Sequence, residues 1–379
     1  MEQLHRLYWP NDYENHLLYF FIQPHQLIEG MLVFISIILI VIVYMLFYLV
    51  HRAGKSLYRQ QLRQQYSEFI SYLAISDSVE ELQNVMEEPE WKNKLAGWLG
   101  NPFARNVLVR ELVTTVKNMS GTAADNASWF YTYTSLDRDS FARLKKGNWH
   151  VKARAIGELA HLKQKQYTTQ IYRHTNNRNE YVRNEARIAI VQLTGFEGLR
   201  FLDIITYPLT EWEQLCLLHE LSLHPIKSIS AANRWLQSSN LSVVEFCLNL
   251  IDSYKLYDLY DDVVNCMFHT EKRIRKKAVA VMKEIYRPET SSLLAQRLET
   301  EEEEVQLAIL QVLEQIGTEN EIAVISKYLH HSRDEFKAAS ARAIGKISAE
   351  GWSAVEKKIN PELIPWNQLL PYLKQEALL

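Results

Sequence analysis

Apolar side chains follow two different patterns along this chain. In the first, residues 31–50 form an uninterrupted apolar run that carries no charge and has Ser36 as its one conventional polar residue. At about 1.5 Å per residue, a helix of this length crosses the roughly 30 Å hydrocarbon core of a bilayer. The run therefore predicts a transmembrane helix over residues 31–50. A cleaved signal peptide fits less well, because its apolar region would be shorter and would follow a short basic segment.

The charges on the two sides of this run differ in sign. Residues 1–30 contain four acidic residues and one arginine, whereas the residues after the run are basic until Glu68. The positive-inside rule then predicts a single-pass protein of the cytoplasmic (inner) membrane, with its N-terminus outside and its C-terminal domain in the cytoplasm. The basic residues share one face of a continuing helix, where they either bind anionic headgroups of the lipid bilayer or only set the orientation. They are Arg52, Lys55, Arg59 and Arg63.

Residues 1–30, on the extracytoplasmic side, are rich in aromatic side chains, which is typical of segments at a membrane interface. His5, His16 and His25 also lie near Asp12 and Glu14 in the sequence. No two of these histidines are spaced to share one helical face, so anchoring at the interface is favoured over a metal site.

The second pattern begins near residue 140 and repeats about every 31 residues. Each copy starts with an apolar residue and carries small or apolar residues four, eight and eleven positions later, which places one buried stripe on a helix. The copies start at Val151, Val182, Val243, Ile274, Val305 and Phe336, and a weaker copy with a one-residue slip lies around residues 212–223. A shorter amphipathic run precedes each copy. The unit is therefore a helix pair that buries its apolar faces only by stacking on its neighbours.

These copies resemble the HEAT-like repeats of the short bacterial type found in bilin lyases. In that family the second helix begins with Val-Arg, has an Ala four residues later and ends near Ala-Leu-Gly. The matching residues here are Val182-Arg183 with Ala186, Ile274-Arg275 with Ala278, and Phe336-Lys337 with Ala343-Ile344-Gly345. The resemblance implies a HEAT-like α-solenoid over residues 140–359. Together with the single transmembrane helix predicted from the apolar run, the expected fold is all-α. The resemblance says little about chemistry.

Two further segments complete the expected organisation. Residues 51–139 are helical without a period, and we expect a juxtamembrane basic helix followed by a divergent helical cap, with Pro102 at a helix start. An apolar stripe on the first of these helices predicts a buried face, formed by Tyr58, Leu62, Tyr66, Phe69 and Leu73. Residues 360–379 are expected to be a C-terminal capping tail, because an array of repeats needs a cover for its last member.

Composition argues against most classes of enzyme. The 379 residues include only 12 Gly and 10 Pro and lack a phosphate-binding loop and the common hydrolase, zinc and redox motifs. Cys216 and Cys247 stand 31 residues apart, as expected of small core residues, and Cys266 is isolated. Residues 301–304 and the pair His330-His331 are expected to be solvated at helix starts and turns. We therefore expect no catalytic residue, cofactor or metal, and no enzyme.

Basic side chains near the start of several second helices could form a column across the array. The richest segment is residues 272–277, and the candidate partner-binding residues are Lys152, Arg183, Arg187, Lys272, Arg273, Arg275, Lys276 and Lys337. A ladder of ion pairs between adjacent repeats is the favoured interpretation, and a binding surface is the alternative. Nucleic acid is not expected as a partner, because the chain after residue 65 has a net charge of −4.

The sequence thus favours a membrane-anchored cytoplasmic scaffold or adaptor, whose array binds protein partners that are themselves membrane-associated. A membrane enzyme complex, such as a polysaccharide-synthesising glycosyltransferase, is one example of a client. The alternative, implied by the resemblance to bilin lyases, is a lyase that acts on a tetrapyrrole-protein conjugate. No Cys, His or acidic residue departs from its repeat position in a way that supports this alternative.

Overall fold

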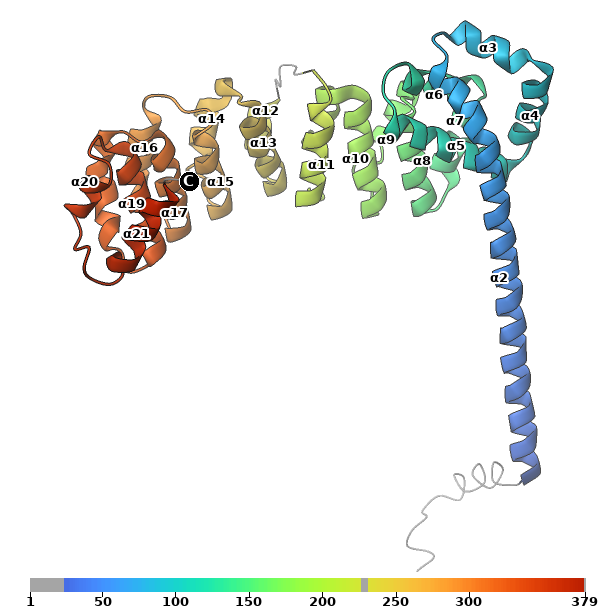
Figure 1. Cartoon of the computed structure of the whole chain (residues 1–379), viewed down its shortest axis with the longest axis horizontal. Coiled ribbons are helices and arrows are strands. Elements are labelled where there is room, and N and C mark those ends of the chain that lie inside the picture. Colours follow the sequence, from blue (N-terminus) through green and yellow to red (C-terminus); the bar gives the residue numbers. More distant parts are fainter. Residues whose placement is uncertain (1–23, 226–230, 378–379) are drawn as a thin grey trace, which may run out of the picture. The chain divides into compact units, whose positions relative to one another are not determined.

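The computed structural model describes residues 24–225 and 231–377, which form α-helices and 3₁₀ helices and no strand (Figure 1). The chain divides into two compact units, residues 1–136 and 137–379, and this boundary is close to the expected start of the repeats at residue 140. The all-α fold predicted from the sequence is confirmed. Most of the aromatic segment at the start of the chain, with His5 and His16, lies outside the described residues.

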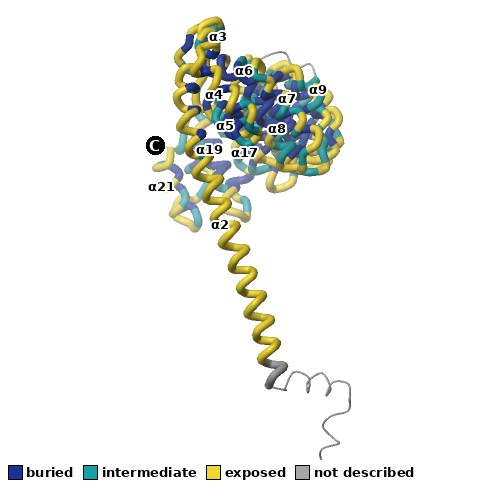
Figure 2. The backbone as a smooth tube through the Cα atoms, turned by 90° about the vertical axis from the view of Figure 1, so that its right-hand side faces the viewer, coloured by how far each residue is buried: buried dark blue, intermediate teal, exposed yellow. Residues whose placement is uncertain are grey.

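The first unit contains a single long helix, α2 (Pro24–Ile75), which begins before the expected span and continues well past it. Among the described residues, this is the one helix long and apolar enough to cross a membrane. Every side chain from Ile28 to Tyr58 is exposed, as the yellow part of the tube in Figure 2 shows. Such a long apolar surface is costly in water, which makes this part of α2 a candidate membrane span.

Beyond Tyr58 the same helix enters the core of the first unit. Leu62, Tyr66, Phe69 and Leu73 are at most 3% exposed, which confirms the predicted apolar stripe at these positions. Tyr58 itself, the first residue of the stripe, is 41% exposed. The span and the core of the first unit therefore share one continuous backbone.

Short helices pack around this part of α2. They are α3 (Val79–Glu87), α4 (Pro89–Gly100), α5 (Pro102–Asn118) and α6 (Thr122–Tyr133). Asn101 caps α5 by accepting from two backbone N–H groups, and Pro102 occupies the first turn, as predicted. The buried Asn126 donates from its amide nitrogen to the carbonyls of Leu73 and Ser76, which otherwise lack a partner at the end of α2.

The second unit is a row of helix pairs whose second helices lie side by side (Figure 1). These second helices are α8 (Trp149–His161), α10 (Glu180–Thr194), α11 (Glu211–Ser222), α13 (Leu241–Tyr254), α15 (Lys272–Met282), α17 (Glu303–Ile316) and α19 (Asp334–Ile347). Successive starts are 31 residues apart, except that α13 begins 30 residues after α11. The slip expected for the weak copy is thus located between these two helices.

The first segment of each pair is short or broken into 3₁₀ turns. These segments are α7 (Leu136–Lys146), η1 (Lys165–Tyr167) with α9 (Thr168–Tyr172), η2 (Gly195–Asp203), α12 (Ala232–Leu236), η3 (Tyr257–Leu259) with α14 (Tyr260–Cys266), α16 (Thr290–Leu298), and η4 (Glu319–Glu321) with α18 (Ile322–Ile325) and η5 (Ser326–His330). Since such short segments are unstable alone, they depend on packing against the second helices.

The predicted stripe forms the core of the second unit. Residues four positions into the stripe are at most 1% exposed in the well-matched copies: Ala155, Ala186, Cys247, Ala278, Ile309 and Ser340. The weak copy corrects one assignment. Because of the slip, Leu217 and not Cys216 occupies the equivalent of Cys247; Leu217 is fully buried, and Cys216 is only partly buried.

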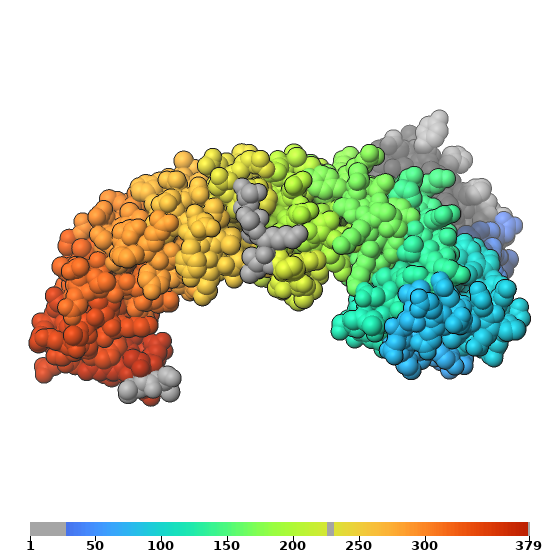
Figure 3. All heavy atoms as spheres, turned by 90° about the horizontal axis from the view of Figure 1, so that it is seen from above, coloured from blue at the N-terminus to red at the C-terminus, as the bar shows by residue number. Residues whose placement is uncertain are grey.

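The array ends in two short helices, α20 (Trp352–Glu356) and α21 (Trp366–Glu376). Trp366, Leu370 and Leu373 on α21 join the continuous core of the second unit, and α21 packs on α19. Viewed from above, the pairs of this unit follow one another in sequence order to the red end (Figure 3). The last pair is therefore covered by the terminal segment.

Ala278 tests the register of the stripe. Its side chain is fully buried, so Ala278→Leu should overpack the contact between helices and lower the free energy of unfolding by about 1–3 kcal/mol. The matched change Lys283→Leu, at a side chain that is 35% exposed, should alter it by less than about 0.5 kcal/mol. Hydrogen exchange should locate the loss of protection in α13, α15 and α17. The reverse ranking of the two variants would show that the register is wrong.

Candidate partner-binding surface

Arg187 lies in the core of the second unit with no exposed surface. Its Nη1 is 2.8 Å from Glu213 Oε1 on the next second helix, and its Nε and Nη2 donate to the carbonyls of Thr175 and Tyr207. Burial lowers the pKa of Arg187, and the neighbouring Glu213 opposes that shift. The prediction that Arg187 faces a partner is therefore corrected: its guanidinium joins α10 to α11.

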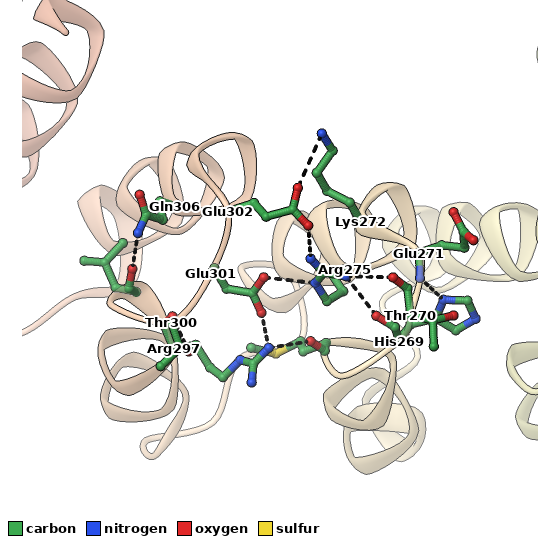
Figure 4. A network of polar contacts seen from close by, with 12 residues as sticks. His269, Thr270, Glu271, Lys272, Arg275, Arg297, Thr300, Glu301, Glu302 and Gln306 are labelled. Carbon is green, nitrogen blue, oxygen red and sulfur yellow. Dashed lines mark hydrogen bonds and ion pairs between the residues drawn. The ribbon is translucent and has the colours of Figure 1, made fainter. Parts of the chain in front are cut away.

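Arg275 is also part of a contact between repeats (Figure 4). Its Nε is 2.9 Å from Glu301 and its Nη2 is 2.8 Å from Glu302, both in the turn that leads into the next second helix. Arg297 pairs with the same Glu301, whose side chain is only 4% exposed. Glu301 thus lies between two guanidinium groups, which corrects the expectation that it is solvated.

Other members of the basic column are bound locally. Lys272 pairs with Glu304 at 2.6 Å, and this hydrogen bond raises the pKa of the Lys272 ammonium. Lys337 pairs with Asp334 of its own helix at 2.7 Å. Arg183 donates to the carbonyl of Asn177, and its guanidinium stacks over the ring of Tyr207 at 4.3 Å. These side chains are committed to contacts within the array.

The basic residues after the membrane span also divide into two groups. Arg63 pairs with Glu111 of α5 at 2.7 Å, and the guanidinium of Arg59 lies 5.9 Å from the ring of Phe103. Both therefore contact the core helices of the first unit, while the Arg63 side chain remains 56% exposed, so their assignment to the membrane surface stays a prediction. Arg52 and Lys55 are fully exposed on α2 and remain available for headgroups.

Three basic candidates lie at the surface of the array. Lys276 is exposed and has no ion-pair partner in the described part of the chain. Arg273, with a side chain that is 69% exposed, pairs with Glu245 of α13 and reaches Glu211 of α11 at 3.7 Å. Lys152 is half-buried near His174, whose pKa is lowered by burial and by the Lys152 charge.

Arg273 of α15 reaches Glu211 of α11 across the face of α13. A groove of about 350 Å³ follows this face, lined by Glu211, Gln214, Glu245, Asn249, Arg273, Lys276, Lys277 and Ala280. A second hollow of about 820 Å³ adjoins it at the helix starts and shares Glu245 and Arg273. We call the first of these the α13 groove.

The floor of the α13 groove is polar. Asn249 Nδ2 donates to Gln214 Oε1 at 2.8 Å, which joins the floor to one wall. Burial raises the pKa of Glu245, while the paired Arg273 acts in the opposite direction. The groove therefore combines a carboxylate of raised pKa with an exposed ammonium at Lys276, and suits a polar partner surface better than an apolar ligand.

Next to the groove, α11 exposes two large apolar side chains, Trp212 at 75% and Leu215 at 61%. The sequence analysis did not identify them as surface residues. Their signal was present, because both lie in the weak copy at positions outside the buried stripe, where the other copies are mostly polar. An exposed Trp beside a groove is the kind of side chain that anchors protein interfaces.

The thiols do not form a reactive site. Burial raises the pKa of Cys266 to about 11, and it also raises the pKa values of Cys247 and Cys216. A thiol of raised pKa is protonated at neutral pH and is a poor nucleophile. Within residues 24–225 and 231–377, no group of three or more His, Cys, Asp or Glu side chains is arranged to hold a metal ion.

One comparison with known families identifies repeats in part of the chain. Residues 260–347 match the family described as HEAT repeats. An engineered protein of known structure aligns over 82% of this chain and 97% of its own, with 16% identity and a TM-score of 0.38. The complex of CpcE and CpcF of a phycocyanin lyase from a Nostoc species aligns over 67% and 94%, with 14% identity and a TM-score of 0.28. The comparison with curated proteins gives no match.

Glu301 provides a test of the contact between repeats. Glu301→Gln removes the charge that two guanidinium groups share in a partly buried site, and should lower the free energy of unfolding by about 1–3 kcal/mol. The matched control is Glu303→Gln, since Glu303 pairs with Arg333 where both side chains are about half exposed; its effect should be below about 1 kcal/mol. Equal effects in chemical denaturation would contradict a structural role for Glu301.

Proposed function

We propose that this HEAT-like repeat protein is a membrane-anchored scaffold without catalytic activity, which binds protein partners on the cytoplasmic side of the inner membrane. The observation that carries the proposal is the continuity of α2, which joins an exposed apolar span to the buried core of the first unit without a break. A flexible linker would have let the domain move freely. A continuous helix instead keeps the first unit close to the bilayer.

Helix geometry gives the distance between the apolar run and the core of the first unit. The contact on α2 that is nearest to the run is the stacking of Tyr58 on Phe103, with ring centroids 5.7 Å apart. Tyr58 is eight residues after Val50, which corresponds to about 12 Å along the helix. Arg52 and Lys55 occupy this interval, where they can contact anionic headgroups.

Tethering supplies the mechanism of the scaffold. Partners that are also bound to the membrane meet the array within one surface, which raises their effective concentration without any new contact. The α13 groove, with Leu215 and Lys276 beside it, is the part of the array that we assign to partner binding. Membrane enzymes, including polysaccharide-synthesising glycosyltransferases, are the clients that fit this mechanism.

The lyase alternative requires a group that reacts with a tetrapyrrole. All three thiols have raised pKa values, and two of them are buried at 5% exposure or less. Joint replacement of Cys216, Cys247 and Cys266 by Ser would abolish a lyase that depended on cysteine, whereas the scaffold requires none of these thiols. We therefore retain the scaffold as the proposed function.

Orientation can be measured with a reporter at the C-terminal end of the chain. We expect activity in the cytoplasm, since Arg52 and Lys55 follow the span while its leading side is acidic. The variant carrying Arg52→Gln and Lys55→Gln should weaken this preference. As a control, Arg63→Gln should leave orientation unchanged and destabilise the first unit instead, because it removes the ion pair to Glu111. An extracytoplasmic reporter in the unaltered protein would overturn the assigned compartment.

Partner binding can be tested by isolating the full chain from native membranes in mild detergent. We expect a stoichiometric protein partner, and Lys276→Glu should reduce its recovery by reversing the free charge beside the groove. The control Lys358→Glu makes the same change at an exposed lysine near the far end of the array. Reproducible recovery of the chain without a partner would count against the scaffold. An equal loss of partner recovery in both variants would count against the groove as the binding site.

A further inference from the structure

The turns that lead into the second helices carry large apolar side chains on their surface. One or more such residues occur at each of five consecutive turns, and their exposed fractions lie between 37% and 75%. They are Trp149, Tyr181, Ile204, Tyr207, Trp212, Leu241 and Phe268. We call this set the turn edge.

These residues lie along the same side of the second unit. The second helices pack side by side in the same direction, so their N-terminal ends form one edge (Figure 1). The rings of Trp149 and Tyr181 stack with centroids 5.1 Å apart, across two successive pairs. Further along, Pro208, Leu241 and Arg273 line one shared hollow. Members of the turn edge thus meet across the first two pairs, and Leu241 lines a hollow that later pairs share.

The fold does not require apolar residues at these positions. Tyr181 and Trp212 are each the second residue of their helix, and the equivalent residues in α15, α17 and α19 are Arg273, Glu304 and Glu335. Those later helices pack their stripes equally well, with Ile274, Val305 and Phe336 fully buried. Trp149 stacks on Tyr181 and Arg183 lies over Tyr207, but these contacts leave large apolar surfaces exposed, which a binding role explains.

Charge accompanies the aromatic residues at the same end of the array. Residues 137–200 contain 13 Lys and Arg against 6 Asp and Glu, a net charge of +7, whereas residues 301–379 contain 8 against 13, a net charge of −5. Lys145, Lys146 and Arg178 are exposed in the first two turns and have no ion-pair partner among the described residues. These cations lie beside Trp149 and Tyr181 in the chain.

We propose that the turn edge is a second membrane-contact surface, which rests on the headgroups of an anionic bilayer. Trp and Tyr side chains prefer the membrane interface, and each lysine or arginine near an anionic leaflet contributes about 1 kcal/mol. Weak contacts of this kind are sufficient, because α2 already holds the chain at the membrane. This inference rests on the membrane anchor of the proposed function. A neutral protein partner would leave Lys145, Lys146 and Arg178 uncompensated, which is why we favour lipid.

Lipid contact along the turn edge has a consequence for the scaffold. The α13 groove runs along the sides of the helices, lined by Gln214, Asn249 and Ala280, which are several residues beyond the helix starts. An array that rests on its turn edge keeps these sides free. Partners would then be bound close to the membrane surface.

The test uses the full chain in lipid nanodiscs with a single fluorescent label. Cys216→Ser removes the partly buried thiol, and Glu180→Cys places the label beside Tyr181. The reference label is at Ser253→Cys, exposed at the opposite end of a second helix. Lipids that carry a quencher in the headgroup region should quench the label at residue 180 several-fold more than the label at residue 253, and more strongly with phosphatidylglycerol than with phosphatidylcholine.

A matched pair of variants identifies the cause. Replacing Trp149, Tyr181 and Trp212 by Ser should reduce quenching at residue 180 to the level of residue 253. The control variant Leu223→Ser with Tyr286→Ser removes exposed apolar side chains outside the turn edge and should leave quenching unchanged. Because all these side chains are at the surface, both variants should fold, which thermal unfolding will verify.

Two outcomes would overturn the proposal. One is equal quenching at residues 180 and 253 in chains that remain inserted in the nanodisc. The other is weak quenching together with specific photo-crosslinking of residue 149 to a protein in native membranes, which would make the turn edge a protein interface. Failure of the anchor gives a different result, since the chain would then be released from membranes by alkaline carbonate. Failure of the scaffold would affect partner recovery alone.

Discussion

The structure of the second unit depends on one constraint: no helix pair can bury its own apolar face. The buried stripe of each second helix is covered only when the next pair packs against it, with a small residue such as Ala186 or Ala278 at the closest approach. This requirement sets the spacing of about 31 residues, the parallel order of the second helices and the need for α21 at the last pair. It also leaves most charged side chains outside the stripe, with Glu213 as an exception that is buried at a stripe position of α11.

Within this frame, ion pairs join neighbouring pairs of helices at particular points. Arg187 with Glu213 is completely buried, and Arg275 with Arg297 encloses Glu301 in a partly buried cluster. Removing one member of such a group leaves charges without compensation, so these residues hold adjacent repeats in register. The surface that remains for partners is accordingly smaller than the number of basic residues implies. It centres on α11, α13 and α15, where Arg273 reaches across the face of α13.

The weak copy and the membrane helix have the most functional relevance. The weak copy buries Glu213, Leu217 and Leu221 as its stripe, and α11 exposes Trp212 and Leu215 next to the α13 groove. In the first unit, α2 is a candidate membrane span over its first half and part of a protein core over its second half. A scaffold for membrane-bound partners requires both properties, an anchor that does not bend freely and a surface that departs from the regular repeat.

Much of this molecule could be predicted from the sequence, because periodicity depends on local geometry. Three features follow from the side chains that a single helix places on one face: the apolar run of residues 31–50, the stripe from Leu62 to Leu73, and the starts of the second helices. In the well-matched copies, each second helix begins two residues before its first stripe residue. Periodicity does not predict which residues from distant parts of the sequence form tertiary contacts. Arg187 can be buried because Glu213 of the next second helix pairs with it. Arg63 forms an ion pair with Glu111, which is 48 residues away in the sequence. In the weak copy, Leu217 is fully buried in the core in place of Cys216. Only the tertiary structure decides such contacts, since they depend on which side chains from distant segments arrive within about 3–4 Å of each other.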